Sequence, residues 1–186
     1  MAGLGRELVG ALAGSDVVPR LIVEHPEPEW RLGALTVVVG KEQARLRYAR
    51  EAVGSARANA ADIAAAWHKA LDRLRARSRP PDELLPALAA AYKRTLARHG
   101  GARLGDRVPL VDVRAALAGY TRAQFAWDLQ RLKRERRLAV GGRRIDVGVA
   151  TGHAALRRSR VVWLEDDAGG GAWYETFRMI PEETHG

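Results

Sequence analysis

The sequence contains no cysteine, and aromatic residues make up only 6 % of its 186 positions. Without cysteine the chain forms no disulfide and has no thiolate to serve as a nucleophile or a metal ligand. The first residues lack the basic start and long apolar segment of a signal peptide. No apolar run approaches the roughly 18 residues that a membrane span requires. These absences predict a soluble, cytoplasmic protein that makes no use of a membrane.

Signals for catalysis or cofactor binding are missing as well. The glycines at 169–171 are not followed by the lysine and hydroxyl residue of a phosphate-binding P-loop. The histidines are scattered without metal-ligand spacing, and no Ser/His/Asp set has a local signature. Asp146 and the acidic run 165–167 are explained more simply as loop acids than as a nuclease-like carboxylate group. We therefore expect no enzymatic activity, no cofactor and no metal.

Positive charge is abundant and unevenly distributed. The net charge is +9, with 13 basic and 11 acidic residues in positions 1–85 against 18 and 11 in positions 86–186. Such an excess favours a nucleic-acid partner, with an anionic membrane surface or an acidic protein as alternatives. A genome of high GC content favours arginine and would also raise the charge without any ligand. The excess lies in the half of the chain that carries the motif described below.

We predict that residues 1–80 form a helical region with a possible pair of short strands, at Leu21–Val23 and Leu35–Val39. A long helix is expected from Lys41 to Arg77. An apolar or small residue recurs there at every seventh position: Leu46, Val53, Ala60, Trp67 and Leu74. Such a stripe packs either inside the monomer or against a second copy or a partner. The prolines at 80–81 end the helix and mark the start of a second domain, residues 82–186.

The sequence of the second domain predicts three helices and, near its end, a β-hairpin. The first helix spans Asp82–His99, and a short strand at Arg107–Leu110 follows. The second helix, Val111–Ala118, leads through a Gly-Tyr turn to a third helix, Arg122–Arg136, which Thr121 caps. Buried positions expected in the second and third helices are Val113, Leu117, Phe125, Leu129 and Leu132.

The outward face of the third helix, together with an insertion at about 140–160, is rich in arginine. Arginine and glutamine recognise base edges through paired hydrogen bonds, and basic side chains hold phosphates. The residues expected to contact nucleic acid are Arg122, Gln124, Gln130, Arg131, Lys133, Arg134, Arg137, Arg143, Arg144, Arg157 and Arg158. The residues expected to contact a protein partner are Trp127, Glu165, Asp166 and Asp167.

The stretch VPLVDVRAALAGYTRAQFAWDLQRLKRERRL resembles the winged helix-turn-helix superfamily in its bacterial form. The matching positions are Leu110, Val113, Arg114, Leu117, Phe125, Leu129, Leu132 and Leu138. The resemblance covers about residues 84–180 and implies DNA binding with the third helix in the major groove, although some relatives bind only proteins. The insertion at 140–160 departs from the pattern by delaying the wing, expected at Val161–Ile180.

The sequence therefore predicts a mainly α (α+β) protein, with a helical N-terminal region and a C-terminal winged helix-turn-helix domain. The predicted function is non-catalytic binding of double-stranded DNA, as a regulator or as the DNA-binding subunit of a larger complex. The alternative is a protein-interaction (scaffold) subunit of a multiprotein assembly whose partner carries the enzymatic activity. The heptad-like helix at 41–77 would then serve homodimerisation or partner binding.

Overall fold

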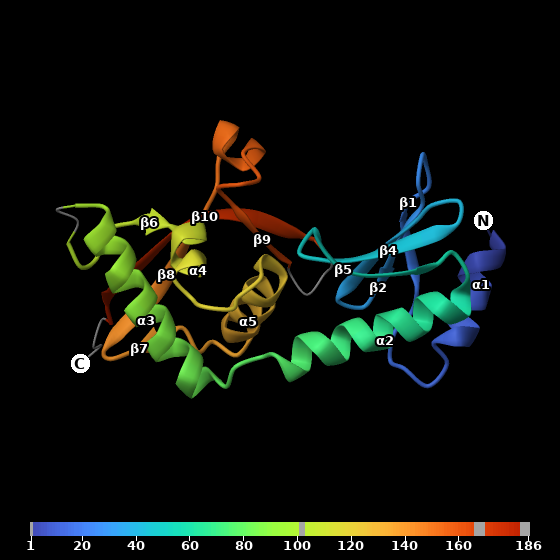
Figure 1. Cartoon of the computed structure of the whole chain (residues 1–186), viewed down its shortest axis with the longest axis horizontal. Coiled ribbons are helices and arrows are strands. Elements are labelled where there is room, and N and C mark those ends of the chain that lie inside the picture. Colours follow the sequence, from blue (N-terminus) through green and yellow to red (C-terminus); the bar gives the residue numbers. More distant parts are fainter. Residues whose placement is uncertain (1, 101–102, 166–169, 183–186) are drawn as a thin grey trace. The chain divides into compact units, whose positions relative to one another are not determined.

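The computed structural model describes residues 2–100, 103–165 and 170–182. The chain divides into two compact units, unit 1 (Met1–Arg77) and unit 2 (Ser78–Gly186). Each unit combines helices with an antiparallel sheet (Figure 1). Among the helices in the described ranges, none has the length and apolar character needed to cross a membrane.

Unit 1 is a helix-covered antiparallel meander. Its elements follow the chain as α1 (Ala2–Ala11), β1 (Arg20–Val23), β2 (Glu29–Leu32), β3 (Leu35–Val39), β4 (Gln43–Tyr48), β5 (Glu51–Arg57) and α2 (Ala60–Ala76). The sheet has the order β1-β2-β3-β4-β5, so each strand pairs with its neighbours in sequence. Helix α2 packs against β4, β5 and α1 (Figure 1). The strands predicted at Leu21–Val23 and Leu35–Val39 are confirmed as parts of this sheet.

Alternating burial accounts for the central strands. In β4 the side chains of Ala44, Leu46 and Tyr48 are buried, while Gln43 and Arg45 are exposed. A period of two is the pattern of a strand with one face on a core. The sheet and α2 are also joined by a polar contact, because the Trp67 indole N–H donates to the Leu32 carbonyl at 2.8 Å.

The mainly α fold class with a helical N-terminal region is wrong, because unit 1 is rich in strands and the protein is α+β with two antiparallel sheets. The helix predicted from Lys41 begins only at Ala60, after the Asn59 cap. Leu46 and Val53 lie on strands, so the heptad stripe does not exist as a continuous helical surface for a second copy.

The predicted helix from Lys41 is wrong because the chain makes a tight turn there without the usual turn residues. Ala49 and Arg50 both have positive φ, 49° and 65°, and they connect the paired residues Tyr48 and Glu51 of β4 and β5. Two-residue hairpin loops require such φ values and usually contain asparagine or glycine. Here alanine and arginine occupy the turn, so the hairpin is hidden inside an alanine- and arginine-rich stretch that favours a helix.

Unit 2 places helices beside a second sheet. Its elements are α3 (Pro81–Arg98), β6 (Val108–Pro109), α4 (Leu110–Ala115), α5 (Arg122–Arg134), β7 (Ala139–Val140), β8 (Arg143–Val149), the 3₁₀ helix η1 (Gly152–Leu156), β9 (Val162–Glu165) and β10 (Gly171–Pro181). The sheet order is β6-β10-β8-β7, and β9 also pairs with β10. The three predicted helices and the Thr121 cap are confirmed, with shorter bounds for the second and third.

The hairpin expected within residues 161–180 is confirmed by the pairing of β9 with β10, in which Trp163 lies opposite Trp173. Strand β10 is longer than the hairpin and continues along β8 and β6. The core of unit 2 includes Tyr92 and Phe177, whose rings are 5.6 Å apart. The predicted buried residues of the second and third helices are confirmed, since each is at most 4 % exposed: Val113, Leu117, Phe125, Leu129 and Leu132.

Candidate nucleic-acid interface

Helix α5 starts at a well-formed cap. The Thr121 hydroxyl oxygen accepts from the Gln124 backbone N–H at 3.2 Å, which satisfies one of the free donors in the first turn. Phe125, Leu129 and Leu132 then anchor the helix in the core. Because the buried positions recur every three or four residues, the cap and the apolar stripe together fix which way every other side chain of α5 faces.

The face predicted to contact base edges is largely covered. Gln124 is only 6 % exposed and Gln130 only 8 %, and Ala123 and Ala126 on the same helix are also buried. Strand β9 packs against α5. In this conformation neither glutamine amide is positioned to reach a base in a groove. The structure therefore brings these two predicted residues into the interior of unit 2.

A buried carboxylate, Asp128, organises the other side of α5. Its side chain is 1 % exposed and accepts hydrogen bonds from the hydroxyls of Ser78 and Tyr120, the latter at 2.9 Å. The Arg79 backbone N–H also approaches it at 3.4 Å, and the Arg131 guanidinium lies 3.8 Å away. A buried charge is tolerated when it is paired and hydrogen-bonded. Asp128 thus fastens the segment before α3 onto α5.

Arg79 and Arg131 complete this polar cluster. The Arg131 guanidinium donates to the Arg79 carbonyl. The Arg79 guanidinium lies 4.8 Å from the centre of the Tyr120 ring and donates to the Ala118 carbonyl at 3.4 Å. Arg131 is only 24 % exposed. It was predicted to contact DNA, and here its charge is directed toward Asp128 and the chain.

Tyr120 has a perturbed acidity because of this cluster. Burial raises the pKa of Tyr120 above its ordinary value of 10.0, and the negative charge of Asp128 and the hydrogen bond to it raise this pKa further. The positive charges of Arg79 and Arg131 oppose these effects only in part. The tyrosine is therefore a neutral donor over the physiological pH range.

Arg122, in the first turn of α5, binds the chain that precedes β9. Its guanidinium donates to the carbonyl of Arg158 at 2.6 Å and to that of Val161, with a longer contact of 3.5 Å to Ser159. These bonds hold the backbone of residues 158–161 against the start of α5. Arg122, also predicted to contact DNA, clamps this segment through these hydrogen bonds.

The clamped segment carries three exposed guanidinium groups, from Arg157, Arg158 and Arg160, which we call the arginine segment. The Arg160 backbone N–H donates to the Arg157 carbonyl at 2.8 Å, so a tight turn brings these residues together. Within the described parts of the chain, no acidic side chain forms an ion pair with any of the three. Like charges held close together repel, and an anion that neutralises them removes that repulsion.

Further residues predicted to contact nucleic acid lie on α5 and β8. The Lys133 ammonium donates to the Tyr174 hydroxyl at 2.7 Å and lies 4.5 Å from the centre of that ring. Arg134 and Arg144 are exposed, on α5 and β8 respectively, and Arg143 is half-buried.

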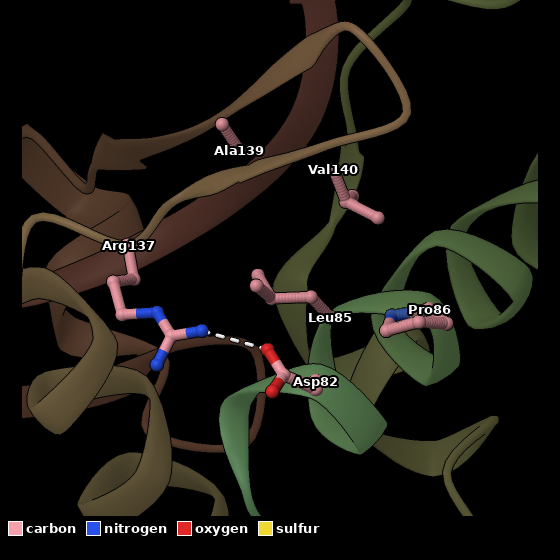
Figure 2. Close-up of a pocket in the computed structure, with 6 residues that line it drawn as sticks. All are labelled: Asp82, Leu85, Pro86, Arg137, Ala139 and Val140. Carbon is pink, nitrogen blue, oxygen red and sulfur yellow. Dashed lines mark hydrogen bonds and ion pairs between the residues drawn. The ribbon is translucent and has the colours of Figure 1, made fainter.

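Arg137 borders a surface hollow of about 460 Å³. Figure 2 shows its guanidinium directed at Asp82, to which it donates at 2.7 Å, and the side chains of Leu85 and Pro86 line the same hollow. The rest of the lining comes from Ala139 and Val140. With one ion pair and otherwise apolar walls, the hollow has no acid–base or nucleophilic group beyond that pair.

The residues predicted to contact a protein partner fall into two groups. Trp127 on α5 is half-buried, and Glu165 at the end of β9 is 7 % exposed. Asp166 and Asp167 lie outside the described residues. Sequence analysis missed the cluster formed by Ser78, Tyr120 and Asp128. The sequence did contain a signal for it. In the α5 segment QFAWDLQRLKR, Asp128 is the single acid among six charged or amide residues.

No group of three or more acidic or histidine side chains that would hold a metal ion exists among the described residues. Comparison with known proteins found no matching family model, no matching curated protein and no matching solved structure.

Proposed function

We propose that unit 2 is a winged helix-turn-helix module that binds double-stranded DNA without catalysing a reaction, mainly through phosphate contacts. The observation that carries this proposal is the arginine segment, three exposed guanidinium groups clamped by Arg122 beside the N-terminus of α5. Exposed arginines on a held backbone are the groups that fix a protein on the phosphate chain of a duplex.

The order of elements supports the assignment of the module. A helix (α3), a short strand (β6) and two further helices (α4 and α5) precede an antiparallel pair, β8 and β10, and β6 pairs with β10. In winged helix-turn-helix proteins the helix at the place of α5 enters the major groove. The start of α5 also supplies the positive end of a helix dipole, which favours a nearby phosphate.

The burial of Gln124 and Gln130 changes what kind of binding is proposed. Phosphate contacts supply affinity but little sequence information, whereas base contacts supply specificity. With both glutamines inside unit 2, we expect similar affinity for duplexes of different sequence. The protein would act by coating or bridging DNA, or by bringing a partner to it, more than by recognising one operator.

The test is a duplex-binding titration with a matched control. We expect Arg157→Ala, Arg158→Ala and Arg160→Ala together to weaken binding to a random duplex by at least about tenfold, since each lost phosphate contact removes counterion release. The control replaces Arg73, Arg75 and Arg77, exposed on and just after the last turn of α2 in unit 1, by alanine. It lowers the net charge by the same amount. Equal affinity of both triple variants would contradict the proposal.

A protein-interaction module is the second candidate, and the half-buried Trp127 favours it. Tryptophan is a frequent anchor in interfaces because it combines a large apolar area with one donor. Unmeasurable binding to duplex at low salt, with the fold intact by circular dichroism, would favour this candidate over DNA binding.

A further inference from the structure

Strand β1 (Arg20–Val23) is an edge of the N-terminal sheet, and among the strands that the structure describes it pairs with β2 alone (Figure 1). Its apolar side chains are exposed on both faces, at 38 % for Leu21, 46 % for Ile22 and 39 % for Val23. Apolar and β-branched side chains on a sheet edge are a template for pairing with another strand.

The central residue of β1 has no partner residue in β2. Leu21 pairs with Trp30 and Val23 pairs with Glu29, so Ile22 is the extra residue at a bulge. Edge strands are commonly protected by charged side chains or proline. Between Leu21 and Val23 there is neither, and charges occur only at the two ends of the stretch, at Arg20 and Glu24.

That stretch is complementary to itself. When two copies of Arg-Leu-Ile-Val-Glu run antiparallel about Ile22, each Arg20 faces a Glu24, each Leu21 faces a Val23, and the two Ile22 residues face each other. Opposite-charge and apolar cross-strand pairs both stabilise antiparallel strands. Arg20 and Glu24 are exposed, and neither forms an ion pair with any residue that the structure describes. Both charges are available to a second copy.

We propose that a second copy of this chain docks on β1, forming an antiparallel β1–β1 contact about a two-fold axis at Ile22. The two N-terminal sheets then join into one continuous sheet. A two-fold contact of this kind is closed, because the same patch on each copy is used once. The heptad-like helix predicted at 41–77 has no part in this dimer, because residues 43–48 and 51–57 form strands.

The opposite edge of the same sheet, β5, does not have these properties. It carries small residues at Ala52, Gly54 and Ala56, and its β-branched residue, Val53, is half-buried. Its last residue, Arg57, is exposed and supplies a matched control for charge reversal.

The experiment measures molar mass by light scattering on the full chain over a range of protein concentrations. A contact between two strands buries less than the roughly 1,600 Å² of a typical stable complex, so the dimer fraction should rise with concentration. We expect the mass to approach twice 20.3 kDa at the highest concentration. Arg20→Glu places like charges opposite each other at both ends of the contact, and should weaken the dimer by about tenfold or more. Glu24→Arg should do the same.

Mixing provides the decisive result. An equimolar mixture of Arg20→Glu and Glu24→Arg chains restores both opposite-charge pairs, so it should dimerise where each variant alone does not. Arg57→Glu should dimerise like the unaltered chain. The proposal is overturned if the unaltered chain stays at 20.3 kDa at every concentration, if both single variants dimerise normally, or if the mixture does not recover. A loss of dimer in Arg57→Glu alone would assign the contact to β5 and equally overturn it.

Discussion

The Tyr120 hydroxyl donates a 2.9 Å hydrogen bond to the carboxylate of Asp128, which is 1 % exposed in the interior of unit 2. Tyr120 follows the turn between α4 and α5, and Asp128 lies in the middle of α5. The same carboxylate accepts from the Ser78 hydroxyl. One buried acid therefore joins the start of unit 2, the turn before α5 and α5 itself.

Asp128→Ala should destabilise unit 2 strongly. Removing the acid leaves the Tyr120 and Ser78 hydroxyls without their acceptor and Arg131 without its nearby charge. Breaking a buried charge cluster from one side costs about 3 kcal/mol. Urea unfolding followed by tryptophan fluorescence measures the loss. Asp82→Ala is the control: Asp82 is 86 % exposed in its pair with Arg137, and surface pairs contribute at most about 1 kcal/mol. Equal losses in the two variants would show that burial of Asp128 is not important for stability.

Tyr120 should give unit 2 an alkaline-sensitive contribution to its stability. The pKa of Tyr120 is raised in the folded state, mainly by burial, so the folded protein holds the phenol proton more tightly than the unfolded chain. The contribution is then fully present below the ordinary value of 10.0 and declines as the pH rises above it. In Tyr120→Phe this dependence disappears. The difference in unfolding free energy between the two proteins should thus shrink at alkaline pH, and a difference that grows there would contradict the assignment.

Helix α1 should be sensitive to one glycine and not to another. A Cβ on Gly5 would lie 2.7 Å from the Trp30 ring, whereas a Cβ on Gly10 would meet nothing within 4 Å. Gly5→Ala should destabilise unit 1 by about 1–3 kcal/mol through overpacking. Gly10→Ala should stabilise it by about 0.5–1 kcal/mol, because alanine favours a helix. Thermal unfolding of both variants is the measurement, and a stabilised Gly5→Ala protein would show that α1 does not pack on Trp30 in this way.

Arg122 should control how well the arginine segment is held. Arg122→Ala removes the hydrogen bonds to the carbonyls of Arg158 and Val161, so residues 157–160 should be cleaved faster by trypsin. Arg94→Ala is a suitable control, because Arg94 also donates to a backbone carbonyl, that of Ala116, at 2.7 Å, but away from the segment. Mass spectrometry of a digestion time course identifies the sites. Unchanged cleavage at 157–160 in Arg122→Ala would mean that the clamp is not what orders this segment.

Sequence patterns predicted unit 2 better than unit 1. The cap at Thr121 and the apolar positions of α5 are local signals, and both predictions are confirmed. In unit 1 the turn at Ala49 and Arg50 uses residues that do not normally favour positive φ, so no local signal separated β4 from β5. The pairing of β4 with β3 and β5 then outweighed the high helix propensity of that alanine-rich stretch.

The site residues were harder to predict because polar side chains on a helix can face either way. Gln124 and Gln130 lie on a helix rich in basic residues, yet β9 packs against α5 and both are buried. Only the return of the chain from β8 through residues 157–161 shows that Arg122 has backbone partners. Contacts between residues far apart in sequence leave no trace in helical periodicity.

The salt dependence of duplex binding shows whether the arginine segment binds phosphates. If the arginine segment holds phosphates, the plot of log affinity against log salt for the unaltered chain should be steep. It should become less steep by roughly one unit for each of Arg157, Arg158 and Arg160 changed to alanine. The Arg73, Arg75 and Arg77 triple variant should keep the original slope. An unaltered slope in the first triple variant, or binding that does not depend on salt in the unaltered chain, would contradict the account.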